Sequence, residues 1–464
     1  MSLSLHQSSQ LVQDTLHQYK HLYFVRDLFL VPLCLAILFT FLKIYRRHLD
    51  PDIQPYLFRG FLLKLVLLPL FLFHHTFIYT GGVDQFTYYW CSNEIIQLFY
   101  IHPAQALQIV FSSYSEFSLN DLNFEMSHFI FAPNESFVIK LTSVLSFLTG
   151  NSFLVTSLLL SFFSYFGCWK IFMFFHKAYP GHARLFAYSC IYIPSVAFWS
   201  SVISKEVYCI GAMGFLFSAI MDIHQHRKIK GYHFILLPVM AYLLIRIKLY
   251  ILLALLIALL FYLLISWLKK IRHPLLRVTA LPLLLILFSA IVYFFGNTFE
   301  SQLEQFAFSN ILNTIKVNYD YLTQENFASS RYTLGTIEPT LGSISKLVPA
   351  SINVTLFRPY IWEANKPITL LAALESLLTL FITLYVVFKV RLRIFRFIFR
   401  DRILMFALIF SLTFAAAVGL TSGNFGTLMR YKIPLMLFYF PMLAVLYILH
   451  RSERKGIPET EALC

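Results

Sequence analysis

Residues 249–268 read LYILLALLIALLFYLLISWL and contain no charged side chain. A helix needs about 20 mostly apolar residues to cross the ~30 Å hydrocarbon core of a bilayer. Apolar runs of similar length recur along the whole sequence, for example at 276–295. The sequence therefore predicts a protein that crosses a membrane many times as α-helices.

The composition of the chain supports this fold class. Of its 464 residues, 58% are hydrophobic and 13% are charged. Soluble proteins average about 25% charged residues, so a soluble fold of this length would lack the charge to cover its surface. The net charge of +14 does not indicate nucleic acid, because lysine and arginine gather in the cytoplasmic loops of membrane proteins. We expect membrane lipids, and no nucleic acid, among the partners.

The expected fold class is all-α: a polytopic transmembrane bundle of about 11–13 spanning helices in a single membrane domain over 1–464. Two long segments, 81–136 and 296–367, are expected to face outward and to contain interfacial helices. The short apolar stretch 137–150 is either an interfacial helix or half of a tight hairpin, and we favour the interfacial helix. The expected spans are about 28–45, 58–80, 152–175, 185–201, 206–223, 232–247, 249–268, 276–295, 368–389, 403–421 and 429–449.

The basic residues predict the orientation. The short connections assigned to the cytoplasm hold 23 of the 37 lysines and arginines, most densely at 389–402. That run is interpreted as a topology anchor resting on anionic lipid. The N-terminus then lies outside and the C-terminus inside, and the mixed charges of the outer face are where chemistry is expected.

The first outward segment contains a candidate catalytic acid. Gly81 and Gly82 end a helix and place Asp84 at the membrane surface beside aromatic residues. One interpretation makes Asp84 a general base that activates an acceptor hydroxyl. The other makes it a cap for the helix that follows, a position that aspartate favours.

Two groups of charges interrupt apolar sequence at outer helix ends. Lys205 and Glu206 are interpreted either as contacts to a phosphate and a sugar hydroxyl or as a solvated helix start. Arg246, Lys248 and Tyr250 lie at an outer turn where the positive-inside rule disfavours cations, which favours a bound anion. Snorkelling to ordinary lipid phosphates is the alternative.

Further candidates follow the second long segment. Arg331 and Arg358 are candidate substrate contacts, although we favour a scaffold pair between Arg358 and Glu363. Arg430 and Tyr431 begin the last helix, where a cation opposes the helix dipole and indicates an anionic partner. The six cysteines show no CxxC and no metal-ligand spacing, so no metal ligands are assigned.

With these residues placed, the chain resembles the GT-C superfamily of integral membrane glycosyltransferases. The resemblance rests on the Gly-Gly-Val-Asp84-Gln segment, on the apolar stretch, glycine break and helix over 136–175, and on the segment from Pro194 to Glu206. Arg430-Tyr431 is similar to a pair found late in some members. The segment from Arg358 to Glu363 also resembles membrane proteins of bacterial exopolysaccharide clusters.

The resemblance implies a GT-C-like fold and a function. A sugar would pass from a polyprenyl-phosphate-linked donor to a glycan or lipid-linked acceptor, with Asp84 as base and Lys205, Arg246, Lys248 or Arg430 holding the lipid phosphate. It implies a bacterial inner membrane and a site facing the periplasm. No cofactor is assigned, and a divalent metal stays open. Asp84-Gln85 departs from the adjacent acids of many members, and their soluble C-terminal domain is missing.

Two alternatives stay open beside the transferase. One is a polymerase of lipid-linked oligosaccharide repeat units, and the other is a flippase or transporter of lipid-linked sugars. A transporter would place ionisable residues near the bilayer midplane on broken helices.

Overall fold

A computed structural model describes residues 25–78, 84–112, 133–268, 331–334 and 340–455. All regular elements in these ranges are helices, and one isolated β-bridge joins Arg331 to Asn424. Eight of the described helices are long and apolar enough to span a membrane, which confirms an all-α polytopic bundle. They are α2 (Asp27–Arg46), α3 (Gln54–Phe73) continued by the π-helix η2 (His74–Ile78), α8 (Phe153–Ala178), α11 (Lys205–His226), α12 (His233–Leu268), α16 (Pro367–Val390), α18 (Arg402–Thr421) and α20 (Ile433–Arg454).

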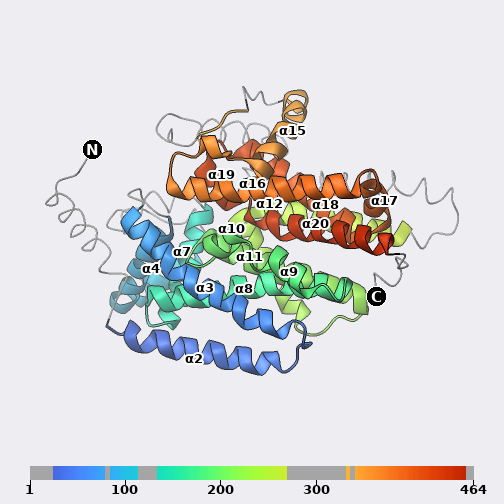
Figure 1. Cartoon of the computed structure of the whole chain (residues 1–464). Helices are drawn as coiled ribbons and strands as arrows, with labels where there is room; N and C mark the ends of the chain where they lie inside the picture. Colours follow the sequence, from blue (N-terminus) through green and yellow to red (C-terminus); the bar gives the residue numbers. More distant parts are fainter. Residues whose placement is uncertain (1–24, 79–83, 113–132, 269–330, 335–339, 456–464) are drawn as a thin grey trace. The chain divides into compact units, whose positions relative to one another are not determined.

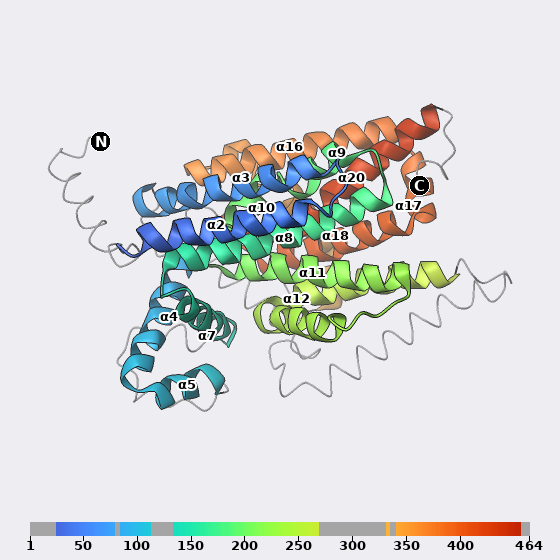
Figure 2. The ribbon, with the colours of Figure 1, turned by 90° about the horizontal axis from the view of Figure 1, so that it is seen from below.

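The described residues divide into two compact units. Unit 1 comprises 1–176 and 186–249, and unit 2 comprises 177–185 and 250–464. In unit 1, α2, α3 and α8 run side by side, and in unit 2 α16, α18 and α20 do so (Figures 1 and 2). The expected single domain stays a prediction, as does the total number of spans, because 276–295 lies outside the described residues.

The expected continuous span at 185–201 is wrong. The structure has two short helices there, α9 (Ala183–Cys190) and α10 (Pro194–Trp199). Pro194 has no backbone N–H and restricts the residue before it to extended conformations. Ile193 accordingly has a ψ of 117°, so the helix is interrupted before Pro194.

Helix α12 changes direction where the sequence predicted a break. Lys248 has non-helical dihedral angles, φ −148° and ψ 77°, and two helices meet there. The first half belongs to unit 1, where His233 lies 3.7 Å from Asp222 of α11. The second half belongs to unit 2, where Ser266 accepts a 3.2 Å hydrogen bond from Arg402 of α18.

A glycine contact brings α8 and α11 together in unit 1. A Cβ atom built on Gly214 would lie 2.1 Å from the carbonyl oxygen of Gly167, and one on Gly167 would lie 2.5 Å from the oxygen of Ile210. Small residues at such positions allow helix backbones to approach closely in membranes. The contact fixes α11, whose first turn carries Lys205 and Glu206.

Three shorter helices of unit 1 form a group at one end of its long helices (Figure 2). They are α4 (Asp84–Ile101), α5 (Pro103–Phe111) and α7 (Pro133–Leu148). Helix α7 has 16 residues, about 24 Å at 1.5 Å per residue, which is too short to cross ~30 Å of hydrocarbon. The expected break after it is confirmed, because Gly150 and Asn151 both have positive φ, 66° and 55°.

In unit 2, α15 (Leu341–Phe357) packs on α18 and α16. The 3-10 helix η6 (Ile361–Glu363) precedes α16, α17 (Arg393–Arg400) joins α16 to α18, and α19 (Phe425–Tyr431) precedes α20. The predicted outer segment 296–367 is described only in part, and its residues 296–330 lie outside the described ranges.

Candidate functional site

Tyr88 of α4 lies among charged residues from three helices of unit 1. Its side chain is buried, and burial raises the pKa of its phenol. The charges of Lys205, Asp84, Glu135 and Glu206 act on the same hydroxyl. The structure thus brings the predicted residues Asp84, Lys205 and Glu206 to one place.

Two ion pairs organise these charges. Lys205 binds Glu135 of α7, and Lys248 at the bend of α12 binds Glu206 with Nζ and Oε1 2.8 Å apart. The side chains of Lys248 and Glu206 are 5% and 4% exposed. The interpretation of Glu206 as part of a solvated helix start is therefore wrong. The expected phosphate contacts of Lys205 and Lys248 stay predictions, and each lysine has a carboxylate partner within the protein.

Hydrogen bonds fix both the first turn of α11 and the segment that precedes it. The Ser204 hydroxyl caps the helix by accepting a 3.2 Å hydrogen bond from the Val207 amide. The buried Lys64 of α3 donates to the carbonyl oxygens of Ala197 and Ser200, at 3.1 and 2.8 Å, and to the Ser200 hydroxyl at 2.6 Å. An ammonium has three donors, so these acceptors use all of them. Lys64 therefore fixes the segment that leads into α11.

Two further cations of unit 1, Arg246 and Lys140, interact electrostatically. The Arg246 guanidinium lies 5.5 Å from the centroid of the Phe137 ring. Burial and, to a smaller extent, the charge of Arg246 lower the pKa of Lys140 on α7. Lys140 donates a 3.1 Å hydrogen bond to the Ser112 carbonyl. The buried Nε of Arg246 has no hydrogen-bond partner in the described part of the chain. Two neighbouring cations with a spare donor are suited to binding an anion.

Three of these residues were not predicted from the sequence: Tyr88, Glu135 and Lys140. Lys140 could have been found, because it is the only charged residue in the apolar stretch 137–150. A charge in such a stretch indicates a function or a partner. Tyr88 and Glu135 gave no such signal, since tyrosines are frequent here and Glu135 precedes the apolar stretch.

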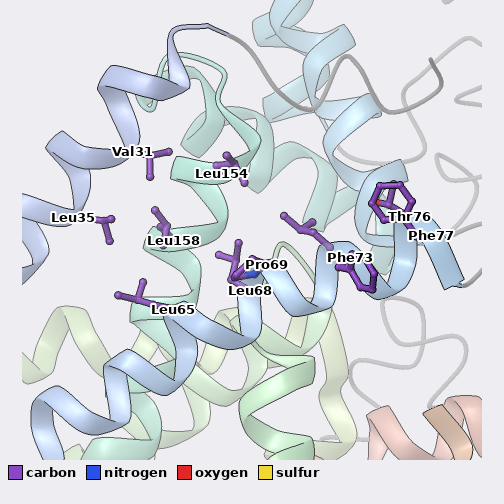
Figure 3. A pocket seen from close by; sticks show the side chains of 11 residues that line it. Val31, Leu35, Leu65, Leu68, Pro69, Phe73, Thr76, Phe77, Leu154 and Leu158 are labelled. Carbon is purple, nitrogen blue, oxygen red and sulfur yellow. The ribbon is translucent and has the colours of Figure 1, made fainter. Parts of the chain in front are cut away.

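An apolar cavity of about 480 Å³ lies between α2, α3 and α8 of unit 1 (Figure 3). Val31 and Leu35 line it from α2, and Leu154 and Leu158 line it from α8. The Thr76 hydroxyl is its one polar side-chain group, and its oxygen is buried without a partner among the described residues. The shape and lining suit a hydrocarbon chain.

The other predicted residues belong to unit 2. The expected pair of Arg358 and Glu363 is confirmed, with Nε and Oε2 3.0 Å apart. The Arg358 guanidinium also lies 5.3–5.8 Å from the ring centroids of Tyr332, Tyr360 and Phe425. These contacts favour the scaffold interpretation of Arg358.

The remaining four residues are placed as follows. Arg331 forms its β-bridge with Asn424, just before α19. The expectation that Arg430 and Tyr431 begin the last helix is wrong, because they end α19, where a cation is favourable, and α20 begins at Ile433. The Tyr250 ring packs against Phe414 of α18, 5.6 Å between centroids. Their predicted substrate contacts stay predictions.

Among the described residues, no group of three or more His, Cys, Asp or Glu side chains is arranged to hold a metal ion. No protein-family model, no curated protein and no solved structure matches this chain.

Proposed function

We propose that this protein is a membrane glycosyltransferase that moves a sugar from a polyprenyl-phosphate-linked donor to an acceptor hydroxyl. The observation that carries the proposal is the pair of Arg246 and Lys140. The Arg246 guanidinium lies over Phe137, about one helical turn before Lys140 on α7, and a phosphate between these two like charges would stabilise both. The lipid phosphate of the donor would occupy this place.

Asp84 is the proposed general base. Glu135 and Glu206 form ion pairs with Lys205 and Lys248, and we assign these two acids structural roles. In the reaction Asp84 takes the proton of the acceptor hydroxyl while that oxygen bonds to the anomeric carbon. The bond from the anomeric carbon to the phosphate oxygen breaks, and the lipid phosphate leaves on Arg246 and Lys140.

The apolar cavity of unit 1 would hold part of the isoprenoid chain. It is lined by leucine, valine, proline and phenylalanine from membrane-spanning helices (Figure 3), where a lipid tail can enter from the bilayer. The positive-inside distribution of the loops favours an outer, periplasmic position for Asp84. Cell-surface polysaccharide or glycoconjugate synthesis is the proposed setting.

One observation favours the transporter alternative. Lys64 is buried within the α3 span and contacts the interrupted helix at Ala197 and Ser200, as expected for a transport site. All three of its donors, however, are used by the protein itself. We therefore prefer the transferase and interpret Lys64 as structural.

Complementation of a deletion strain, followed by mass spectrometry of its lipid-linked glycans, tests the proposal. The matched variants are Asp84→Asn and Glu94→Gln, which remove one acid each from the same helix, the second at an exposed position. We expect glycans lacking one sugar in the deletion strain and in D84N, and wild-type glycans in E94Q. Turnover by D84N at the wild-type rate would overturn the mechanism.

The same profile separates the alternatives. Complete single repeat units would accumulate if the protein were a polymerase. Translocation of a lipid-linked sugar by purified protein in liposomes, without covalent change, would identify a flippase.

A further inference from the structure

Cations from three helix ends of unit 2 meet at one boundary of the membrane-spanning helices. Helix α16 ends at Val390 and α18 begins at Arg402, so α17 connects the ends of two candidate membrane spans (Figure 1). Helix α17 contacts α16, α18 and α20. The segments 389–402 and 450–455 contain nine lysines and arginines and two acids.

The arrangement leaves a surplus of positive charge. Arg393 and Arg396 both bind Glu453 of α20, the first with Nη1 and Oε2 3.0 Å apart. The charges of Arg393, Arg454 and Lys389 act together on His450. The Nδ1 atom of His450 is buried without a hydrogen-bond partner among the described residues. Glu453 is the one acid among these residues, because Asp401, the second acid of the two segments, accepts a hydrogen bond from the Tyr179 hydroxyl.

Helix α17 and the residue before it expose large apolar side chains. Leu392, Phe395 and Phe399 are 82%, 62% and 69% exposed, while Phe397 and Ile398 pack inward. Phe395 and Phe399 are one helical turn apart and therefore share a face beside Arg396 and Arg400. Aromatic side chains next to guanidinium groups at a bilayer boundary are typical of a helix lying among lipid headgroups.

We propose that α17, with Lys389, His450 and Arg454, forms a binding site for the phosphate group of an anionic phospholipid. We call these residues the α17 site. The surplus cations complement the lipid phosphate, and Phe395 and Phe399 contact the upper part of its acyl chains. The exposed apolar side chains favour a lipid over a soluble phosphate, because a soluble anion would leave them in contact with water. This site is separate from the donor site proposed in unit 1 and does not depend on it.

Titration of the purified, delipidated full-length chain with short-chain phosphatidylglycerol or phosphatidylcholine tests the site, with bound lipid counted by native mass spectrometry. We expect wild type to prefer phosphatidylglycerol. The double variant Arg393→Gln/Arg396→Gln should bind it on the order of ten-fold more weakly, since each basic residue near an anionic surface contributes to binding. Inorganic phosphate at the same concentration should not compete with the lipid.

Two further variants make the test decisive. Lys43→Gln/Arg47→Gln removes the same charge from the exposed end of α2 and should leave the affinity unchanged. Glu453→Gln should tighten phosphatidylglycerol binding, because the carboxylate competes with the lipid phosphate for Arg393 and Arg396. Equal affinity of wild type for both lipids, or equal losses in the two double variants, would overturn the proposal. Weaker binding by E453Q would do the same, even if the arginine variant failed to fold.

Discussion

Lys248 and Glu206 form a buried ion pair, 2.8 Å between Nζ and Oε1, at the point where α12 bends and α11 begins. Both residues interrupt long apolar segments, and each side chain is at most 5% exposed. Each charge therefore offsets part of the cost of removing the other from water. The pair couples the bend of α12 to the first turn of α11, whose Lys205 and Glu206 act on the Tyr88 hydroxyl.

Replacing Lys248 by methionine should destabilise the protein by about 3–5 kcal/mol, because it removes the ion-pair partner of a buried carboxylate. The double variant Lys248→Met/Glu206→Leu should recover most of this loss, since an apolar pair of similar volume is often neutral. Thermal unfolding of the purified protein in detergent measures both. A Lys248→Met variant that melts at the wild-type temperature would contradict the buried pair.

Lys64 should also be needed for stability. Its replacement by methionine removes three hydrogen bonds and leaves the carbonyl oxygens of Ala197 and Ser200 without their cation. We expect the free energy of unfolding to fall by about 1.5–3 kcal/mol, the contribution of one hydrogen bond to a charged group. The fall is smaller than the sum of three such bonds, because removing a buried charge also removes the cost of its desolvation. Hydrogen exchange should rise at 200–205. Lys43→Met, at an exposed position of α2, is the control and should change neither quantity.

The close approach of α8 and α11 predicts the effect of a single methyl group. In Gly214→Ala the new Cβ would lie 2.1 Å from the Gly167 carbonyl oxygen, so the two helices must separate. We expect the free energy of unfolding to fall by about 3 kcal/mol or more, which is the upper end of the usual cost of overpacking a core. Gly231→Ala is the matched control, because no atom lies within 4 Å of a Cβ at that position. Equal melting temperatures for the two variants would show that the helices are not in contact there.

Much of the fold could be predicted from hydrophobic run length. The run over 249–268 and the charges at Arg246 and Lys248 together gave a break where the structure has its bend. The length of a hydrophobic run does not, however, indicate whether the helix is interrupted within it. The helix at 185–201 was therefore predicted as continuous, although Pro194 was a local signal for the break.

The candidate site was only partly predictable. Charges in apolar surroundings pointed to Lys205, Glu206 and Lys248, because such charges need partners. The partners themselves depend on which helices pack together, and that is not visible in a single sequence. Glu135, 70 residues before Lys205, was missed for this reason. The division of the predicted residues between two units also follows from long-range packing.

The pair of Arg246 and Lys140 predicts a pH dependence. Burial and the nearby guanidinium lower the pKa of Lys140 below its ordinary value, so its amine becomes neutral at a lower pH than an ordinary lysine. Anion binding at this pair should weaken as the pH rises through that lowered pKa. Arg246→Gln removes the second cause and leaves burial, so the pKa of Lys140 should rise part of the way toward the ordinary value.

Acetylation with limiting acetic anhydride measures this shift, because only the neutral amine reacts. The extent of labelling of the Lys140 peptide is followed against pH by mass spectrometry, with exposed Lys228 in the same sample as the reference for reagent decay. The midpoint should move to higher pH in R246Q. It should also move upward in wild type when farnesyl phosphate is added, because a bound anion favours the ammonium form. If neither change moves the midpoint, Arg246 and Lys140 do not act on one another and the proposed phosphate site loses its support.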